Sequence, residues 1–396
     1  MRGVSRVTIV TPFYPPDAGG IAVHVYELVN KLTSLGIRCQ VITCAKDINT
    51  SCSLEKVGDE LEVIRINSIT PISFPETMKN FRIPFCTSHL SDKIISFDPD
   101  VIHLHGHHYP INWLIAMNRK FRDIPKVLTM HGMYALNPYK EGGKTLIEEL
   151  FNQSIFRCLL SNVDSVIALT PTIAKYVVKY HNKKPVFVIP NGVNLKNFKK
   201  NLHRKLEYRK KYNLPEDKKV ILFRGRFNHV KGVIDYSRAA AILSKQRDDL
   251  YFLAVGGGPL EQFVKEIFRK YVYGKVMSWV PYEKIHELYI ASDIYVLPSK
   301  WEALPITLIE AMASGLVIVA TKISSIMDVL KEYPRSILLY RSSVGFLVKG
   351  ILRALELLST TRREHELKTL EEYDWHLITQ KIINVYAYTS CRRYSL

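Results

Sequence analysis

The sequence predicts an α/β protein made of two doubly wound, Rossmann-like domains. Three observations lead to this prediction. The chain has 396 residues, more than one hydrophobic core usually accommodates, so two domains of roughly 180 to 200 residues are expected. Apolar runs of strand length alternate with helical patterns, which is typical of a parallel sheet covered on both faces. The alternation then restarts after the polar, lysine-rich stretch 194–219.

In the first half, short apolar runs predict buried strands, and a helical pattern over residues 22–35 follows the first of them. These strands are expected at residues 7–10, 39–43, 63–66, 101–104, 126–130 and 165–169.

The second half repeats this arrangement. Its strands are expected at residues 220–223, 250–255, 275–279, 294–297 and 316–320. Ligands of doubly wound folds bind at the carboxyl ends of the strands, so two such domains predict a cleft between the two sheets. We expect domains at residues 1–197 and 198–374, with a final helix, about 375–396, that packs back on the first domain.

The chain is strongly basic, with 55 Lys and Arg against 37 Asp and Glu, a net charge of +18. Such a charge favours a polyanionic partner. No basic block with interleaved aromatic residues matches a nucleic-acid module, so nucleic acid is not the expected partner. Basic and bulky apolar residues mix in 79–85, and residues 119–122 form a second basic cluster. This composition fits an anionic membrane surface, although each cluster alone also fits a solvated helix face.

A membrane-spanning helix requires an apolar run of about 18 residues, and no apolar run in the sequence approaches that length. A strand pattern begins at Val7, which leaves no room for a signal peptide. We therefore expect a cytoplasmic protein, peripheral on the inner face of the membrane. The chain has 6 cysteines, and no two of them form a C-x-x-C pair, which predicts reduced, mostly buried thiols.

Glycine-rich turns follow three of the predicted strands. Gly19 and Gly20 come before the first helix and offer backbone amides and the positive end of a helix dipole to an anion. A tight turn that simply needs glycine is the alternative. The sequence G-R-F-N-H-V-K-G at 225–232 places Arg226 and Lys231 where both could reach a diphosphate. Gly256 opens a third turn on the same predicted rim.

Two glutamates, Glu302 and Glu310, lie eight positions apart. Pro305 favours a helix start, because proline fits the first helical turn. We therefore place Glu302 in the loop after strand 294–297 and Glu310 in the helix that begins near Pro305. Taken alone, Glu310 could merely decorate that helix.

His131 ends the strand at 126–130, where its ring could donate to a sugar hydroxyl or stabilise charge on a reacting group. His103, His105, His107 and His108 resemble a metal cluster, but no carboxylate lies among them and the last two begin a loop. The D-x-D sequence at 98–100 precedes a strand, at the sheet end away from the predicted cleft. The sequence therefore predicts chemistry without a metal.

Several motifs, taken in order, resemble the family-4 retaining glycosyltransferases of the GT-B fold, over about residues 5 to 330. They are P-P-D-A-G-G (15–20), V-I-H-L-H-G (101–106), T-M-H-G (129–132), I-P-N-G-V-N (189–194), G-R-F-N-H-V-K-G (225–232), V-G-G-G-P (255–259), A-S-D-I-Y-V-L-P-S (291–299) and E-A-L-P-I-T-L-I-E-A-M-A-S-G (302–315).

The resemblance implies that the second domain binds a nucleotide-diphosphate sugar, that the first binds chiefly the acceptor, and that no cofactor or metal is needed. Arg226 and Lys231 would hold the diphosphate, and Glu310 would hold the ribose hydroxyls. Glu302 would contact the transferred sugar, and His131 would lie beside it. The resemblance also assigns donor contacts to these positions: Gly19, Gly20, Gly256, the backbone near Val280, and the loop Ala303, Leu304 and Pro305.

Three departures from the family pattern stand out. Residues 321–325 read T-K-I-S-S where many relatives have glycines, Asn194 stands where aspartate is common, and the stretch after Val348 goes directly into a helix. None removes a charged group of the expected site, so an active enzyme is expected. A phosphorylase or sugar-nucleotide isomerase of the same fold, and a catalytically silent glycan- or lipid-binding relative, remain alternatives.

Overall fold

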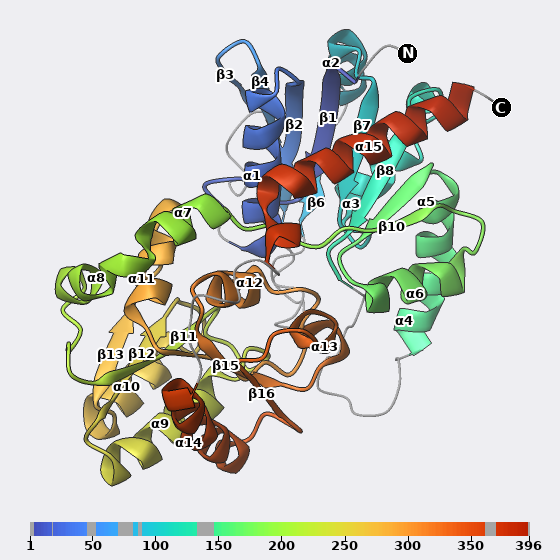
Figure 1. Ribbon diagram of the computed structural model, residues 1–396. Coiled ribbons are helices and arrows are strands. Elements are labelled where there is room, and N and C mark those ends of the chain that lie inside the picture. Colours follow the sequence, from blue (N-terminus) through green and yellow to red (C-terminus); the bar gives the residue numbers. More distant parts are fainter. Residues whose placement is uncertain are drawn as a thin grey trace. The chain divides into compact units, whose positions relative to one another are not determined.

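The computed structural model describes residues 4–17, 19–45, 53–69, 82–85, 89–132, 146–360 and 370–394. The chain divides into two units (Figure 1). Unit 1 contains Met1–Asn191 and Trp375–Leu396, and unit 2 contains Gly192–Asp374. The division thus falls six residues before the one that the sequence suggested, and the C-terminal helix belongs to unit 1.

Unit 1 is built on an 8-stranded sheet in the order β10-β9-β8-β7-β1-β2-β4-β3. All neighbours are parallel except β3, which pairs antiparallel with β4. The strands are β1 (Arg6–Thr11), β2 (Arg38–Cys44), β3 (Ser53–Val57), β4 (Leu61–Ile66), β7 (Val101–His105), β8 (Lys126–Met130), β9 (Ser165–Ala168) and β10 (Val186–Val188); β5 (Ser68–Ile69) and β6 (Ile83–Pro84) pair separately. The helices are α1 (Gly20–Ser34), α2 (Leu90–Phe97), α3 (Pro110–Ala116), α4 (Leu146–Phe151), α5 (Arg157–Ser161), α6 (Pro171–Tyr180) and α15 (Trp375–Tyr394).

The central strands of unit 1 are buried along almost their whole length because helices cover them; these strands are β1, β2, β7, β8 and β9. The apolar face of α1, with Val25, Leu28 and Leu32 at helical spacing, packs into one core with β1 and β2. Helix α15 completes the same core through Trp375 and Tyr386, both fully buried. Figure 1 shows α15 running across this sheet, beside α1.

Unit 2 repeats the design with a 6-stranded, wholly parallel sheet in the order β13-β12-β11-β14-β15-β16. Its strands are β11 (Lys219–Arg224), β12 (Leu250–Val255), β13 (Gly274–Met277), β14 (Ile294–Leu297), β15 (Val317–Thr321) and β16 (Ser336–Leu339). Its helices are α7 (Leu195–Asn201), α8 (Lys205–Lys211), α9 (Val233–Gln246), α10 (Glu261–Tyr271), α11 (Ile285–Ala291), α12 (Ile306–Ala313), α13 (Ser324–Leu330) and α14 (Val344–Thr360). Helices α9, α10 and α14 pack with the central strands in one core.

The thiols only partly follow the sequence expectation. Of the cysteines that the structure describes, Cys39 and Cys44 are buried and free, and burial raises the pKa of each to about 12. Cys158 and Cys391 are exposed, so the prediction of mostly buried thiols holds for half of those described. Cys52 and Cys86 lie outside the described residues.

Candidate functional site

The candidate site in unit 2 lies at the carboxyl edge of its sheet, where loops follow β11, β12 and β14. Backbone hydrogen bonds join these loops: Phe227 donates to the Gly257 carbonyl at 2.9 Å, and Lys300 donates to the Val230 carbonyl at 2.8 Å. The loops approach so closely that only glycine fits at two positions. A Cβ on Gly256 would lie 2.0 Å from the Gly225 carbonyl oxygen, and one on Gly232 would lie 2.1 Å from that of Pro298.

Lys231 and Glu302 meet across two of these loops. Lys231 Nζ lies 2.5 Å from Glu302 Oε1, which also accepts a 2.7 Å hydrogen bond from Ser299 Oγ. The Glu302 side chain is 6% exposed and the Lys231 side chain 30%. The sequence assigned these residues to different parts of a donor, whereas the structure pairs them. An anionic ligand that binds Lys231 therefore has to share the ammonium group with Glu302 or displace Glu302 from it.

Residues 321–325, where the sequence departs from the glycine-rich pattern, support the same glutamate. Ser325 Oγ donates to the Glu302 backbone carbonyl at 2.8 Å. The serine thus fixes the loop that carries Glu302, and a glycine at that position could not make this bond.

Arg226 follows β11 and is partly exposed. Within the described residues it forms no ion pair, so its guanidinium is available to an anion. Gly258 packs closely beside it, since a Cβ on Gly258 would lie 3.2 Å from Arg226 Cγ.

The loop and helix after β14 hold the remaining residues predicted to contact the donor. Leu304 and Pro305 are buried, Ala303 is partly exposed, and α12 begins at Ile306, directly after Pro305. Glu310 is 1% exposed in the second turn of this helix. Val280 lies beyond β13 and is partly exposed. The expected placement of Glu302 on a loop and Glu310 on a helix therefore agrees with the structure.

Glu310 has two partners that sequence reasoning missed. Arg224 Nη1 donates to Glu310 Oε2 at 2.5 Å, and the Tyr289 hydroxyl donates to the same oxygen at 2.8 Å. One signal was available: Arg224 directly follows four buried apolar residues of β11, and a buried charge needs a partner.

Unit 1 gathers histidines at the carboxyl ends of neighbouring strands β7 and β8. His105 Nδ1 lies 2.9 Å from His131 Nε2. His24, which the sequence analysis did not identify, packs on both rings from α1, and its Nδ1 lies 2.9 Å from Asn191 Oδ1. The signal for His24 was a histidine one helical turn after Gly20, on the buried face of the helix.

Burial keeps these rings neutral, because a charged imidazole loses its hydration there. It lowers the pKa of His24 to about 4 and the pKa of His105 and His131 well below their usual value. His24, His105 and His131 offer ligand atoms that all lie within 4.8 Å of one another. The trio could bind sugar hydroxyls or a metal ion.

The other histidines of the suspected metal cluster have structural roles. His103 is fully buried and bonds to the Tyr386 and Thr129 hydroxyls, each at 2.7 Å. His107 lies beyond the strand and packs against Phe156, with ring centroids 4.9 Å apart. The four-histidine cluster seen in the sequence is therefore not one site.

The glycine turn before α1 keeps the open backbone that the sequence suggested. Gly19 has φ of 141°, nothing lies within 4 Å of a Cβ built on Gly19 or Gly20, and the first turn of α1 carries no acidic residue.

The two basic clusters differ from the predicted membrane contact. Arg82 is 5% exposed, pairs with Asp17 at 2.7 Å, and donates to the Cys44 carbonyl at 2.7 Å. In the second cluster Phe121 is fully buried, while Arg119, Lys120 and Arg122 are exposed. Arg82 and Phe121 therefore serve the fold and cannot insert into a membrane. Residues 79–81 lie outside the described residues.

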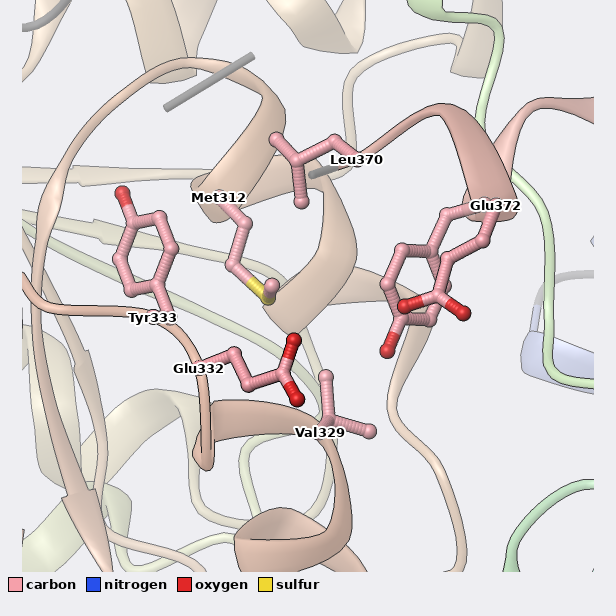
Figure 2. A pocket seen from close by; sticks show the side chains of 7 residues that line it. Met312, Val329, Glu332, Tyr333, Leu370 and Glu372 are labelled. Carbon is pink, nitrogen blue, oxygen red and sulfur yellow. The ribbon is translucent and has the colours of Figure 1, made fainter. Parts of the chain in front are cut away.

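Unit 2 also has a small open pocket away from these residues. Figure 2 shows Met312 and Glu332 close together at one side of this pocket and Glu372 at the other. Its lining residues are Met312, Val329, Glu332, Tyr333, Leu370, Glu372 and Tyr373. None of them belongs to the predicted site, and neighbouring glutamates alone do not define a ligand.

Comparison with known proteins decides the family. Residues 204–366 match the model of "Glycosyl transferases group 1", and residues 18–197 match that of "Glycosyltransferase Family 4". Together these matches cover most of the chain. The chain belongs to the group 1 and family 4 glycosyltransferases.

A yeast relative of this glycosyltransferase matches it over nearly its whole length. The phosphatidylinositol N-acetylglucosaminyltransferase GPI3 subunit of Saccharomyces cerevisiae is 25% identical over 397 residues, covering 96% of this chain and 82% of that protein.

Solved structures agree on the fold. Sucrose-phosphate synthase from Thermosynechococcus elongatus superimposes with a TM-score of 0.80 at 19% identity, covering 98% of this chain and 100% of that one. Anabaena HepE in complex with UDP superimposes with a TM-score of 0.70 at 15% identity, covering 97% of this chain and 99% of that one. The two-unit architecture is the GT-B fold that the sequence predicted. Among the helices that the structure describes, none has the length and apolar character that a membrane crossing requires.

Proposed function

We propose that this glycosyltransferase moves a sugar, a hexose in our interpretation, from a nucleotide-diphosphate sugar to an acceptor hydroxyl with retention of anomeric configuration. One observation carries the proposal. At the carboxyl edge of one parallel sheet, an arginine without an ion-pair partner among the described residues, Arg226, shares a set of interlocked loops with the Lys231–Glu302 pair. This edge is where doubly wound sheets bind ligands.

The chemistry fits these groups. Breaking the anomeric bond leaves positive charge on the sugar and negative charge on the departing diphosphate, so fixed cations there lower the barrier. Arg226 supplies a planar fork and Lys231 a point charge for the phosphates. Glu302 accepts hydrogen bonds from sugar hydroxyls, and Glu310 accepts them from ribose. Gly19, Gly20, Gly256, Val280, Ala303, Leu304 and Pro305 complete the proposed donor contacts.

No side chain of the proposed site is needed as a covalent nucleophile. The acceptor attacks from the face that the diphosphate leaves, and a phosphate oxygen takes the acceptor proton. His131 contributes a neutral ring beside the transferred sugar, consistent with its lowered pKa.

We further propose that the reaction is metal-independent. The His24, His105 and His131 nitrogens favour a specific second possibility, a bound metal ion. Two of these rings already share the 2.9 Å contact between His105 and His131, which uses one nitrogen of each, so we favour hydroxyl binding.

The acceptor class follows by analogy only. The yeast relative is named for N-acetylglucosaminyl transfer to phosphatidylinositol, so a polyol, free or lipid-linked, is our first candidate for the acceptor. Glycans and other small molecules with hydroxyl groups form the remaining classes. A phosphorylase or isomerase of the same fold is the competing enzyme, and a silent glycan- or lipid-binding relative is the competing binding protein.

One experiment tests the proposal. A thermal-shift panel of nucleotide-diphosphate sugars identifies the donor, because a bound ligand raises the melting temperature. That donor is then incubated with polyol, glycan and lipid acceptors, with and without EDTA. We expect transfer that EDTA leaves unchanged, a product whose anomeric NMR signal matches the donor, and loss of activity in Glu310→Gln.

Four results would count against specific parts of the proposal. Sugar 1-phosphate formed from inorganic phosphate would identify a phosphorylase. An inverted product would exclude retention, and stoichiometric metal whose removal abolishes transfer would exclude metal independence. Neither transfer nor donor hydrolysis, despite donor binding, would favour the silent relative.

An anionic membrane surface stays a prediction. Arg119, Lys120 and Arg122 provide exposed charge without the apolar insertion first expected, so binding should be purely electrostatic. We expect the protein to sediment with phosphatidylserine-containing vesicles at low salt and to be released by about 0.5 M salt. Replacing the three cations by glutamine should abolish sedimentation. Absence of binding at low salt would remove the membrane from the proposal.

A further inference from the structure

Arg224, the last residue of β11, forms a three-residue cluster with Glu310 of α12 and Tyr289 of α11. Arg224 Nη1 donates to Glu310 Oε2 at 2.5 Å and lies 3.4 Å from the Tyr289 hydroxyl. That hydroxyl donates to the same carboxylate oxygen at 2.8 Å. The Arg224 guanidinium also lies 5.9 Å from the centre of the Tyr289 ring. One carboxylate oxygen thus receives two donors from two different elements.

The cluster is buried. Glu310 is 1% exposed, Tyr289 is fully buried, and the Arg224 side chain is 11% exposed. Burial would lower the pKa of Arg224, but the Glu310 carboxylate together with Tyr289 and Tyr295 outweighs burial and raises this pKa above its usual value. Burial and the same carboxylate raise the pKa of Tyr289. The cluster therefore consists of a guanidinium, a carboxylate and a neutral phenol.

The pairing leaves one side of the carboxylate unused. Within the described part of the chain, Glu310 Oε1 and Arg224 Nε are buried and have no hydrogen-bond partner. A buried acceptor without a donor is costly, and native proteins rarely keep one without a reason. A buried ion pair is also weak evidence for stability, because apolar residues of similar volume often serve as well. The arrangement is better explained by a ligand that supplies the missing donor.

We propose that Arg224 is a positioning residue for nucleotide binding. It holds Glu310 in one orientation, with Oε2 occupied and Oε1 left to accept a hydrogen bond from a ribose hydroxyl of the donor. Tyr289 assists by fixing the same oxygen. This inference rests on the proposed function, since it takes Glu310 as the ribose-binding residue.

The proposal predicts that breaking the Arg224–Glu310 pair lowers the affinity only for nucleotides that carry the ribose hydroxyls. A merely structural ion pair would, when broken, weaken every nucleotide equally, because the whole edge of the sheet would be disturbed. A positioning role affects only ligands that carry the hydroxyls. A ribonucleoside diphosphate and its 2′,3′-dideoxy analogue share base and diphosphate, so they separate the two cases.

The experiment measures dissociation constants by calorimetry. UDP, GDP and ADP are compared first, and the one that binds wild type most tightly is paired with its 2′,3′-dideoxy analogue. We expect Arg224→Met to raise the dissociation constant of the ribonucleotide by about 10-fold or more, the range for a lost charge-assisted hydrogen bond. Binding of the dideoxy analogue should change by less than about threefold. Arg224→Lys should recover part of the loss.

Matched variants keep the test decisive. Arg247→Met makes the same chemical change at a pair with Asp249 that is about half exposed, and it should alter neither constant. Tyr289→Phe removes the hydroxyl that bonds to Glu310 and to Arg224 without changing any charge, so this variant replaces Arg224→Met in the test if Arg224→Met fails to fold. We expect Tyr289→Phe to raise the dissociation constant of the ribonucleotide alone, by a smaller factor than Arg224→Met does.

The outcomes separate the two levels of the argument. Equal weakening of both ligands, or no weakening of either, overturns the role of Arg224 while leaving the proposed function intact. If wild type binds none of the three diphosphates, nor any nucleotide-diphosphate sugar of the thermal-shift panel, the proposed function fails and the role of Arg224 fails with it.

Discussion

Arg226→Ala and Lys231→Ala should each lower the turnover of sugar transfer by about 10²-fold or more, by analogy with the loss of one oxyanion-stabilising donor. The reason is electrostatic. Charge develops on the departing diphosphate, and a cation already fixed at the sheet edge stabilises that charge without reorganising. Arg226 has no ion-pair partner among the described residues that would have to be displaced first.

The two substitutions should differ in their side effects. Lys231 is paired with Glu302, so its removal also leaves a nearly buried carboxylate with fewer partners, which costs stability. Lys231→Met combined with Glu302→Gln removes both charges together. We expect the double variant to regain stability but not turnover.

The measurement is steady-state transfer with the donor found by thermal shift, using circular dichroism to check folding. Lys265→Ala is a suitable control, because the Lys265 side chain is 54% exposed and, within the described part of the chain, forms an ion pair only with Glu261 on the same helix. It should change turnover by less than about twofold, as expected for an exposed ion pair. Near-normal turnover in both Arg226→Ala and Lys231→Ala would refute the diphosphate assignment.

The features that the sequence predicted well are those with a local physical cause. Continuous apolar runs become buried parallel strands, and the expected boundaries of the central strands differ from the observed ones by at most two residues. Pro305 marks the start of α12, which separates Glu302 from Glu310. Strands with a weaker apolar pattern were missed. One of them is β3, which lies at the antiparallel edge of its sheet. The strand expected at residues 275–279 was too long at its end, because β13 ends at Met277 and Trp279 is 45% exposed.

Pairings between distant residues could not be predicted. Glu310 meets Arg224 and Tyr289, and no pattern in one sequence shows which buried charge pairs with which. The orientation of the side chains in the two basic clusters could not be predicted for the same reason. Arg82 and Phe121 look like interfacial residues by composition, yet Arg82 pairs with Asp17, 65 positions away, and Phe121 is fully buried. Composition gives the residue types of a segment but not the direction in which its side chains point.

The largest effect on stability should come from Arg209, which ties α8 to the start of β11 and the end of α11. Its guanidinium donates to Asp293 Oδ2 at 2.6 Å and to the carbonyls of Ala291, Glu216 and Lys218 at 2.8 to 3.1 Å. The Arg209 side chain is 4% exposed and that of Asp293 is 8%. Breaking a buried pair by removing one partner typically costs about 3–5 kcal/mol, so Arg209→Met should lower the free energy of unfolding by that amount.

The same cluster sets the sign of a pH dependence. Burial alone would raise the pKa of Asp293, but Lys205 and Arg209 outweigh it and hold that pKa below its usual value. A carboxylate with a depressed folded-state pKa contributes stability above its unfolded pKa, about 3.9, and loses it as pH falls toward the folded value. Wild type should therefore lose part of its unfolding free energy below about pH 4, and Arg209→Met should lose less, because Asp293 then titrates closer to its unfolded pKa.

Urea unfolding at pH 7 and at several values down to about pH 3 measures both effects, provided that the transition of unit 2 is resolved from that of unit 1. Arg247→Met is again the control, since its pair with Asp249 is about half exposed and should contribute at most about 1 kcal/mol. Asp293→Asn tests the same cluster by removing the carboxylate that pairs with Lys205 and Arg209. In the double variant with Arg209→Met, the two losses of unfolding free energy should not add. If Arg209→Met cost no more than the control, the buried cluster would not be what anchors α8 to the sheet.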